Sequence, residues 1–453
     1  MCEMKGPIGR AIDGWQKRQT TRLSMPGHKG NDKILPALSR FRDITELPEF
    51  DNLHAPQACI LRSEQQIADI YKVKKSYFLV NGASGGLKAS LLSLGDSAKT
   101  LRIPRNAHRS IWQGCLLAGI EPVYIQPDLS QGIILPPSIE SYQRKSADAT
   151  LILTTSYEGA VIDYSELAGD GILIADEAHG SHLSFGNIKS AISYADITVH
   201  GTHKTLGSLT QSGLLHSNNK IPQDRLLESL SMMESTSPSW LLLSSVEEAV
   251  IVWDQMKRHG ELQRLWERCA CLRARINRIP GFRIPEGIKD VQWDPLHLCI
   301  QTEDGLNGGR LLNILETEFA VDLEMSTDGY IVGILGPFDN PETDEQLLHA
   351  LEELSRKMEL KDQFGKREQL YWPQPEQVIG LKQAYDAKKR QVNLAAAAGC
   401  IAATPVSAYP PGIPLLLPGE KISQELCEIL MNWQKQGVWI EGLADGKIKV
   451  IED

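Results

Sequence analysis

The sequence predicts a doubly wound α/β fold built around a mainly parallel sheet. Between residues 77 and 215, about six short strand-like runs, most of them apolar, alternate with stretches of helical periodicity, which is typical of βαβ units. Runs that are apolar throughout indicate strands buried on both faces. The runs are Tyr77–Val80, Leu101–Ile103, Val123–Ile125, Leu151–Leu153, Ile172–Ala175 and Ala195–Val199. Ligands of such sheets bind at the carboxyl ends of the strands, so the residues that follow each run are the candidates for function.

The segment before the sheet is predicted to form a short helix and two loops. Ile8, Ile12 and Trp15 share one face of a helix over residues 7–19. Residues 24–30 (SMPGHKG) contain proline and glycine, which predicts a loop, either solvated or ligand-binding. A second irregular stretch covers residues 44–56.

A glycine-rich turn, NGASGG at residues 81–86, follows the first run and precedes a helical stretch from Leu87 to Leu94. Backbone amides at a helix start bind anions, and the hydroxyl of Ser84 adds a donor. The turn is therefore a candidate phosphate site, although turns of small residues also occur without a ligand. It matches neither the Walker pattern nor the dinucleotide-binding spacing.

His108 lies where the second run leads into a helix, within RNAHRS at residues 105–110. The helix dipole at such a position disfavours protonation of the ring. A neutral imidazole there can stack on a flat ligand, and a helix-capping histidine is the alternative.

Acidic and basic side chains follow the fifth and sixth runs. Asp176 ends the fifth run, and His203 and Lys204 come soon after the sixth. Pyridoxal phosphate requires a lysine for its Schiff base and a carboxylate for its pyridinium nitrogen. A surface aspartate and a surface lysine are the alternative for either residue alone.

The second half of the chain has a different pattern. Residues 241–276 lack proline and keep helical periodicity, which predicts a long connecting helix that is broken near Gly260. Residues 295–359 predict a small α+β domain: a strand, a helix, two strands joined at Asp328–Gly329 and a charged helix from Glu342. The predicted units are an N-terminal arm (1–45), a large cofactor-binding domain (46–255), the small domain (256–360) and a C-terminal domain (361–453).

Length and composition predict a globular protein of two or three domains. The chain has 453 residues, more than one compact core accommodates. Its formal net charge of -10 argues against nucleic acid or an anionic membrane surface as partner. The eight cysteines show no Cys-x-x-Cys pair, so neither a metal site nor a disulfide framework is indicated. With no leader and no apolar run near the ~18 residues that span a bilayer, we expect a cytoplasmic protein.

Taken together, seven collinear segments resemble the Orn/Lys/Arg decarboxylase family, in its short form without a receiver-like N-terminal domain. The segments are PGHKG at 26–30, ITELPEFDNLHAP at 44–56, RNAHRS at 105–110, DEAHGSH at 176–182, THKTLGSLTQ at 202–211, TSPSW at 236–240 and YPPGIPLLLPGE at 409–420. The resemblance implies the aspartate-aminotransferase fold and pyridoxal-phosphate-dependent decarboxylation of lysine, ornithine or arginine. It also implies a homodimer or larger homo-oligomer with active sites between subunits.

The resemblance also implies roles for individual residues. It makes Lys204 the Schiff-base lysine, Asp176 the partner of the pyridine nitrogen and His108 the residue stacked on the ring. His203 would lie beside the reacting lysine, and either of these two returns a proton to the α-carbon. The remaining expected cofactor contacts are Ala83, Ser84, Gly85, His179 and Thr202, and the candidate acceptors for the cationic end of the substrate are Glu420 and Asp51.

Three positions depart from the family pattern. Ala83 replaces the usual Thr or Ser of the turn, and Gly201 replaces a frequent Ser. Each change is expected to remove a phosphate hydrogen bond worth about 1.5–3 kcal/mol. Asn52 stands in place of the second acid of the usual acidic pair. The alternatives are an aminotransferase-type enzyme, which needs a group such as arginine to hold the substrate carboxylate, and a non-catalytic paralogue.

Overall fold

The computed structural model of the chain describes residues 21–22, 51–218, 220–302, 307–358, 372–408, 413–435 and 439–452. The expected helix over 7–19, the loop at 24–30 and the first part of both 44–56 and 409–420 lie outside these residues.

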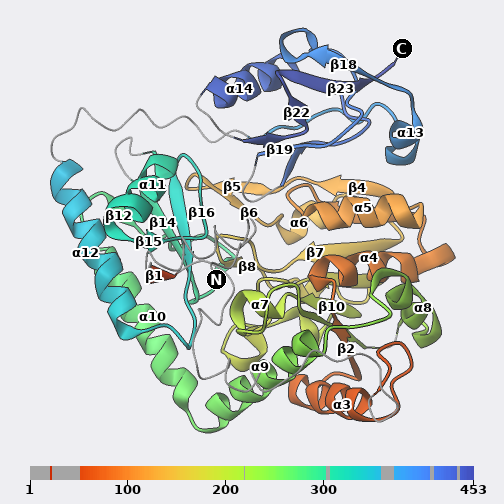
Figure 1. The fold of residues 1–453 in the computed structure, drawn as a ribbon. Helices are drawn as coiled ribbons and strands as arrows, with labels where there is room; N and C mark the ends of the chain where they lie inside the picture. Colours follow the sequence, from red (N-terminus) through yellow and green to blue (C-terminus); the bar gives the residue numbers. More distant parts are fainter. Residues whose placement is uncertain are drawn as a thin grey trace, which may run out of the picture.

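A seven-stranded sheet organises the large domain (Figure 1). Its strands, in spatial order, are β2 (Lys75–Leu79), β11 (Gly213–Ser217), β10 (Ile197–His200), β9 (Ile172–Asp176), β7 (Ala149–Leu153), β3 (Thr100–Pro104) and β4 (Glu121–Ile125). The pairs from β10 to β4 are parallel, whereas β11 is antiparallel to both of its neighbours. The predicted six strands and mainly parallel sheet are confirmed, and β11 is a seventh strand.

Helices cover both faces of this sheet. On one face, α4 (Gly82–Leu94), α5 (Arg109–Ala118) and α8 (Gln223–Met233) bury Leu87, Ile111 and Leu226 in one apolar cluster with Leu79. On the other, α3 (Cys59–Tyr71) and α9 (Trp240–Arg258) pack in a second cluster that contains Phe78. Neighbouring residues of a strand point to opposite faces, so β2 contributes to both clusters. Shorter elements of this domain are β5 (Asp128–Ser130), β6 (Ile133–Leu135), α6 (Ile139–Gln143), β8 (Ala160–Val161) and α7 (Thr202–Thr205).

The connecting helix is broken where the sequence predicts it. α9 ends at Arg258 and α10 (Glu261–Ile276) begins after Gly260, whose φ of 72° is left-handed and suits glycine. The small domain that follows, at the left of Figure 1, has a four-stranded antiparallel sheet flanked by helices. Its elements are β12 (Phe282–Arg283), β13 (Gln292–Trp293), β14 (His297–Thr302), α11 (Gly308–Phe319), β15 (Val321–Asp322), β16 (Met325–Ser326), β17 (Tyr330–Ile334) and α12 (Pro341–Met358). β1 (Thr21–Arg22) pairs with β15.

The C-terminal segment forms a separate layer, drawn in blue above the large domain in Figure 1. It has two three-stranded sheets and a core of its own that includes Leu416, Leu426 and Ile448. Its elements are α13 (Leu381–Asp386), β18 (Lys389–Asn393), β19 (Val406–Ala408), β20 (Pro414–Leu416), α14 (Gln424–Lys435), β21 (Ile440–Glu441), β22 (Leu443–Ala444) and β23 (Lys447–Ile451). The boundaries at residues 45, 255 and 360 stay predictions. Among the described helices, none is both long and apolar enough to cross a membrane.

Candidate active site

A cavity of about 360 Å³ lies at the carboxyl edge of the parallel strands. Residues that follow β2, β3, β7, β9 and β10 line it, in agreement with the rule that ligands of such sheets bind at strand ends. The predicted site residues among its lining are Ala83, Ser84, His108, Asp176, His179, His203 and Lys204.

The register of two parallel strands brings Lys204 to this cavity. Val199 of β10 lies beside Asp176 of β9, and α7 begins after Gly201. Nζ of Lys204 lies 2.6 Å from Nε2 of His179 and 5.4 Å from the centre of the Tyr157 ring. Burial lowers the pKa of Lys204 to about 8, although the nearby carboxylate of Asp176 acts in the opposite direction. About a tenth of the lysine is therefore a free amine at pH 7, far more than for an unperturbed lysine.

Asp176 is a buried carboxylate that lines the cavity. It is 3 % exposed, and its Oδ1 accepts a hydrogen bond of 3.1 Å from the amide of Ala178. No described residue donates a hydrogen bond to Oδ2. Burial raises the pKa of this carboxyl group, which Lys204 partly offsets. A cationic ligand group at Oδ2 would stabilise the charged form.

His108 combines the two roles that the sequence left open. It precedes α5, and its Nδ1 accepts hydrogen bonds from the amide of Ser110 at 3.2 Å and from the hydroxyl of Ser110 at 2.9 Å. The ring caps the helix and also lines the cavity. Burial, together with the positive charge of Lys204, lowers its pKa to about 3. The ring is therefore neutral and can pack against a flat ligand.

The start of α4 forms one end of the cavity. Gly82, Ala83 and Ser84 line it, and Gln211 faces them from the loop before β11. The left-handed φ of +67° at Gly82 explains the glycine. The first amides of a helix lack partners within the helix and attract anions. Together with the hydroxyl of Ser84, they suit a phosphate group.

Gly201 lies where the loop after β10 packs closely against the loop after β9. A Cβ at this position would lie 2.9 Å from the carbonyl oxygen of Ala178 and 3.3 Å from Cδ of Lys204. The amide of Gly201 also donates to that carbonyl, at 3.2 Å. A serine would need the backbone to shift, so the glycine is matched to this packing.

His203 lies beside Lys204 on α7. Its Nδ1 donates to the carbonyl of Ser212 at 2.9 Å, which leaves Nε2 as an acceptor in the neutral ring. Burial lowers the pKa of His203 to about 4, so the ring is neutral above that pH.

Four predicted residues do not line the cavity. Thr202 is buried behind it, where its hydroxyl contacts Ser208 and Ser212 at 2.8 and 3.1 Å. Gly85 faces the carboxylate of Glu234, whose Oε1 lies 2.5 Å from an ideal Cβ.

The two carboxylates expected to bind substrate are engaged elsewhere. Both oxygens of Asp51 accept amides at the start of α3, those of Gln57 and Ala58 at 2.8 and 2.7 Å among them. Glu420 is 1 % exposed and pairs with Arg105 at 2.9 and 3.1 Å. The structure therefore places these two residues in the framework of the fold.

Several lining residues were not predicted. Tyr157 packs on His179 with ring centres 4.3 Å apart, and Glu158 accepts a 2.6 Å hydrogen bond from the hydroxyl of Tyr330. Both follow β7, so the strand-end rule that found Asp176 would have found them too. Other unpredicted lining residues are Asn81, Asn106, Thr155, Ser156, Thr210 and Gln211.

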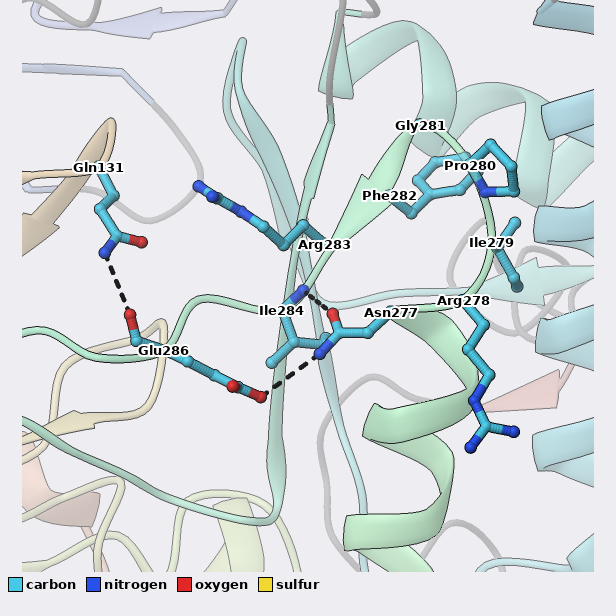
Figure 2. A pocket seen from close by; sticks show the side chains of 10 residues that line it. All are labelled: Gln131, Asn277, Arg278, Ile279, Pro280, Gly281, Phe282, Arg283, Ile284 and Glu286. Carbon is cyan, nitrogen blue, oxygen red and sulfur yellow. Dashed lines mark hydrogen bonds between the residues drawn. The ribbon is translucent and has the colours of Figure 1, made fainter.

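A second cavity, of about 420 Å³, lies at the small domain (Figure 2). Its polar side chains are largely bonded to their neighbours: Asn277 bonds the amide of Ile284 and the carboxylate of Glu286, and Gln131 bonds the carbonyl of Glu286. None of the predicted site residues lines it.

The chain has the fold of a solved decarboxylase and of a solved aminotransferase. Lysine decarboxylase A from Pseudomonas aeruginosa superposes with a TM-score of 0.79 at 17 % identity, covering 99 % of this chain and 76 % of that one. Ureidoglycine-glyoxylate aminotransferase from Bacillus subtilis superposes with a TM-score of 0.58 at 14 % identity, covering 76 % and 96 %.

The chain belongs to the Orn/Lys/Arg decarboxylase family. The family's major domain matches residues 6–297, and its C-terminal domain matches residues 365–437. An arginine decarboxylase of Bacillus subtilis is 28 % identical over 485 aligned positions, which cover 100 % of this chain and 98 % of the relative. The resemblance inferred from the sequence is thereby confirmed.

Proposed function

We propose that this protein decarboxylates a basic amino acid, lysine, ornithine or arginine, with pyridoxal phosphate as its cofactor. The observation that carries the proposal is that Lys204, Asp176, His108 and the start of α4 surround one cavity in a member of this decarboxylase family.

The chain's own residues fit this cofactor. Lys204 is the only lysine among the described residues that line the cavity, and it would bind the aldehyde carbonyl of the cofactor. Oδ2 of Asp176 would accept the pyridinium N–H, and the neutral ring of His108 would pack on the flat face. The amides at the start of α4 would bind the phosphate together with Ser84. When bound, the cofactor supplies an electron sink for the bond that breaks at the α-carbon.

The protein's part in the reaction is to hold protons and to exclude water. Asp176 favours a protonated pyridine nitrogen because a nearby carboxylate raises the pKa of a cation. The hydrogen bond between Nζ of Lys204 and Nε2 of His179 holds a proton inside the cavity. Lys204 would return a proton to the α-carbon, because the neutral ring of His203 carries its proton on Nδ1, where it is donated to the carbonyl of Ser212.

The lining of the cavity favours decarboxylation over transamination. Transamination needs a group, typically an arginine, that keeps the substrate carboxylate bound. None of the described lining residues is an arginine. A substrate carboxylate in a poorly solvated cavity is instead free to leave as CO2.

Glu158 is the acceptor that we assign to the cationic end of the substrate. It is the one carboxylate besides Asp176 among the described residues of the lining, and it is 6 % exposed. No described lysine or arginine pairs with it. A buried carboxylate without a cationic partner favours a positively charged ligand. This assignment replaces Glu420 and Asp51.

We further propose that the protein works in the cytoplasm as a homodimer or larger homo-oligomer. The family resemblance supports the assembly, with active sites between subunits. The cysteines of the described residues are all free, which agrees with a reducing compartment. Light scattering of the purified protein tests the assembly, and a monomer that retains full activity would contradict it.

A product screen tests the activity. Full-length protein is loaded with pyridoxal phosphate and incubated separately with lysine, ornithine and arginine, and cadaverine, putrescine, agmatine and CO2 are measured. We expect one of the amines with an equal amount of CO2. Keto acids in their place would show an aminotransferase.

Lys204→Ala is the matched variant. It should abolish both amine formation and the visible absorbance of lysine-bound cofactor, because no other described lysine lines the cavity. A wild-type protein that shows no such absorbance, and that Lys204→Ala leaves unchanged, would indicate a non-catalytic member of the family.

A further inference from the structure

A chain of buried hydrogen-bonding groups leads from Lys204 into the small domain. Nζ of Lys204 contacts Nε2 of His179 at 2.6 Å, and Nδ1 of His179 lies 3.4 Å from Nε2 of His297. Nδ1 of His297 then contacts Oδ2 of Asp294 at 2.8 Å. His179 is 5 % exposed, and His297 and Asp294 are fully buried. Asp294 and His297 belong to the segment that opens β14, more than 100 residues from His179 in sequence.

Asp294 is held firmly at the end of this chain. Its Oδ1 accepts hydrogen bonds from His182 at 2.9 Å and from the amide of Leu296 at 2.9 Å. Its own amide donates to the carbonyl of Gly159 at 2.8 Å. Burial acts to raise the pKa of Asp294, but its bonds to His182 and His297 hold the pKa well below its usual range. The group is therefore a carboxylate that can only accept hydrogen bonds.

A fixed acceptor at one end orders the protons along a chain of neutral imidazole rings. In its neutral form, His297 donates its one proton from Nδ1 to Oδ2 of Asp294, which leaves Nε2 as an acceptor. His179 then carries its proton on Nδ1 and presents an unprotonated Nε2 to Lys204. This is the arrangement that accepts a hydrogen bond from an ammonium group.

We propose that Asp294 and His297 are positioning residues that hold His179 in the tautomer whose Nε2 accepts a hydrogen bond from the Lys204 ammonium. The small domain thereby controls how much of Lys204 is a free amine. The inference deepens the proposed function, in which Lys204 binds the cofactor.

Other groups near Lys204 also influence its pKa, and a test of the proposal must leave them unchanged. The carboxylates of Asp176 on β9 and Glu324 after β15 favour its charged form. Tyr157 after β7 contributes its ring face. The remaining titratable groups are His108 before α5, His203 on α7 and Glu158 after β7. All of them remain in the variants below.

Asp294→Asn is the decisive substitution. Oδ1 of residue 294 accepts two hydrogen bonds, so the amide NH2 group is expected at the place of Oδ2, where it donates to Nδ1 of His297. His297 and then His179 would take the opposite tautomers, and an N–H would face Lys204. The same exchange of carboxylate for amide in a Ser-His-Asp triad gives the wrong histidine tautomer.

The experiment measures Lys204 directly and needs no activity. Carbonyl compounds are removed from the full-length protein by dialysis against hydroxylamine, and lysines are trace-labelled with acetic anhydride over a series of pH values. Mass spectrometry of the Lys204 peptide then gives the midpoint of its reactivity. The wild-type midpoint is expected at a pH of about 8. Asp294→Asn should lower it by about one pH unit, because a hydrogen bond to a charged group is lost.

Two further variants separate this role from a structural one. His297→Phe removes the acceptor for Nδ1 of His179 and should shift the midpoint in the same direction. His182→Gln keeps a donor to the other oxygen of Asp294 and should retain the wild-type midpoint. An unchanged or raised midpoint in Asp294→Asn, or an equal shift in His182→Gln, would overturn the proposal. If wild-type protein fails to bind pyridoxal phosphate while these shifts persist, the proposed function fails and the positioning role stands.

Discussion

At the scale of single residues, the two carboxylates of the cavity differ in their surroundings. Asp176 lies near Lys204 on the neighbouring strand end, whereas Glu158 bonds the hydroxyl of Tyr330 from the small domain. Burial raises the pKa of both groups. Each is therefore stabilised in its charged form by a cation, which for Asp176 is the pyridinium nitrogen in our proposal and for Glu158 is the side chain of the substrate.

Glu158→Gln tests whether Glu158 binds the cationic end of the substrate. The substitution keeps the size of the side chain and removes the charge, so KM for the basic substrate should rise about 10-fold or more, with a smaller change in kcat. Steady-state kinetics measure the split. Norleucine, which lacks the terminal charge, is the control: its inhibition constant should be the same in wild type and variant. A fall in kcat at unchanged KM would show that Glu158 does not bind the cationic end.

At the scale of elements, the ion pair of Arg105 and Glu420 joins the end of β3 to the C-terminal domain. Arg105 is 2 % exposed and also donates to the carbonyls of Pro414 and Leu415. The sequence shows Glu420 only as an acid in a turn of proline and glycine, and its partner lies 315 residues away. Local sequence pattern cannot show that Glu420 pairs with Arg105. The glutamate therefore looked free to bind a cationic substrate.

Glu420→Gln distinguishes a structural role, in the ion pair with Arg105, from a role in substrate binding. Loss of the carboxylate leaves a buried guanidinium without its charge partner, so we expect the free energy of unfolding to fall by about 3–5 kcal/mol. Chemical denaturation measures it. The matched control is Glu441→Gln, which breaks the partly exposed pair with Arg109 between the same two domains and should cost less than about 1 kcal/mol. A stable Glu420→Gln protein with a raised KM would restore the role in substrate binding.

At the scale of the whole molecule, the sequence predicted what local pattern encodes. Apolar runs revealed six strands of the central sheet, and the strand-end rule brought Asp176, His108 and Lys204 to one cavity. β11 was missed because His216 interrupts its apolar pattern, and that residue is buried only by bonding Ser76 and His200 across the sheet, at 2.8 and 3.2 Å.

Contacts between domains were beyond local pattern altogether. Asp294 and His297 reach the site through tertiary packing, and nothing near them in sequence marks them as neighbours of Lys204. The close approach of Ala178 that requires Gly201 is likewise visible only in the fold.

Buried acids also set how the stability of the whole protein depends on pH. Burial raises the pKa of Glu64 on α3 to about 8 and that of Glu234 to about 7, from ordinary values of 4.5. The native protein therefore binds these protons more tightly than the unfolded chain. Their contribution is complete below pH 4.5 and is lost as the pH rises through the native pKa values. His108, His203 and Lys204 have lowered pKa values, so their contribution to stability rises with pH. For the two histidines this rise lies below pH 6.5, and for Lys204 it lies mainly above pH 8.

Above about pH 6.5, the two glutamates should therefore dominate, and the unfolding free energy of the wild type should fall between pH 6.5 and 8. Glu64→Gln should remove about 1–2 kcal/mol of that fall, because its amide cannot ionise, while the smaller contribution of Glu234 remains. Urea denaturation at a series of pH values measures both curves. Glu166→Gln, at an exposed position, is the control and should retain the wild-type slope. A Glu64→Gln protein with that same slope would show that Glu64 is ionised in the native state.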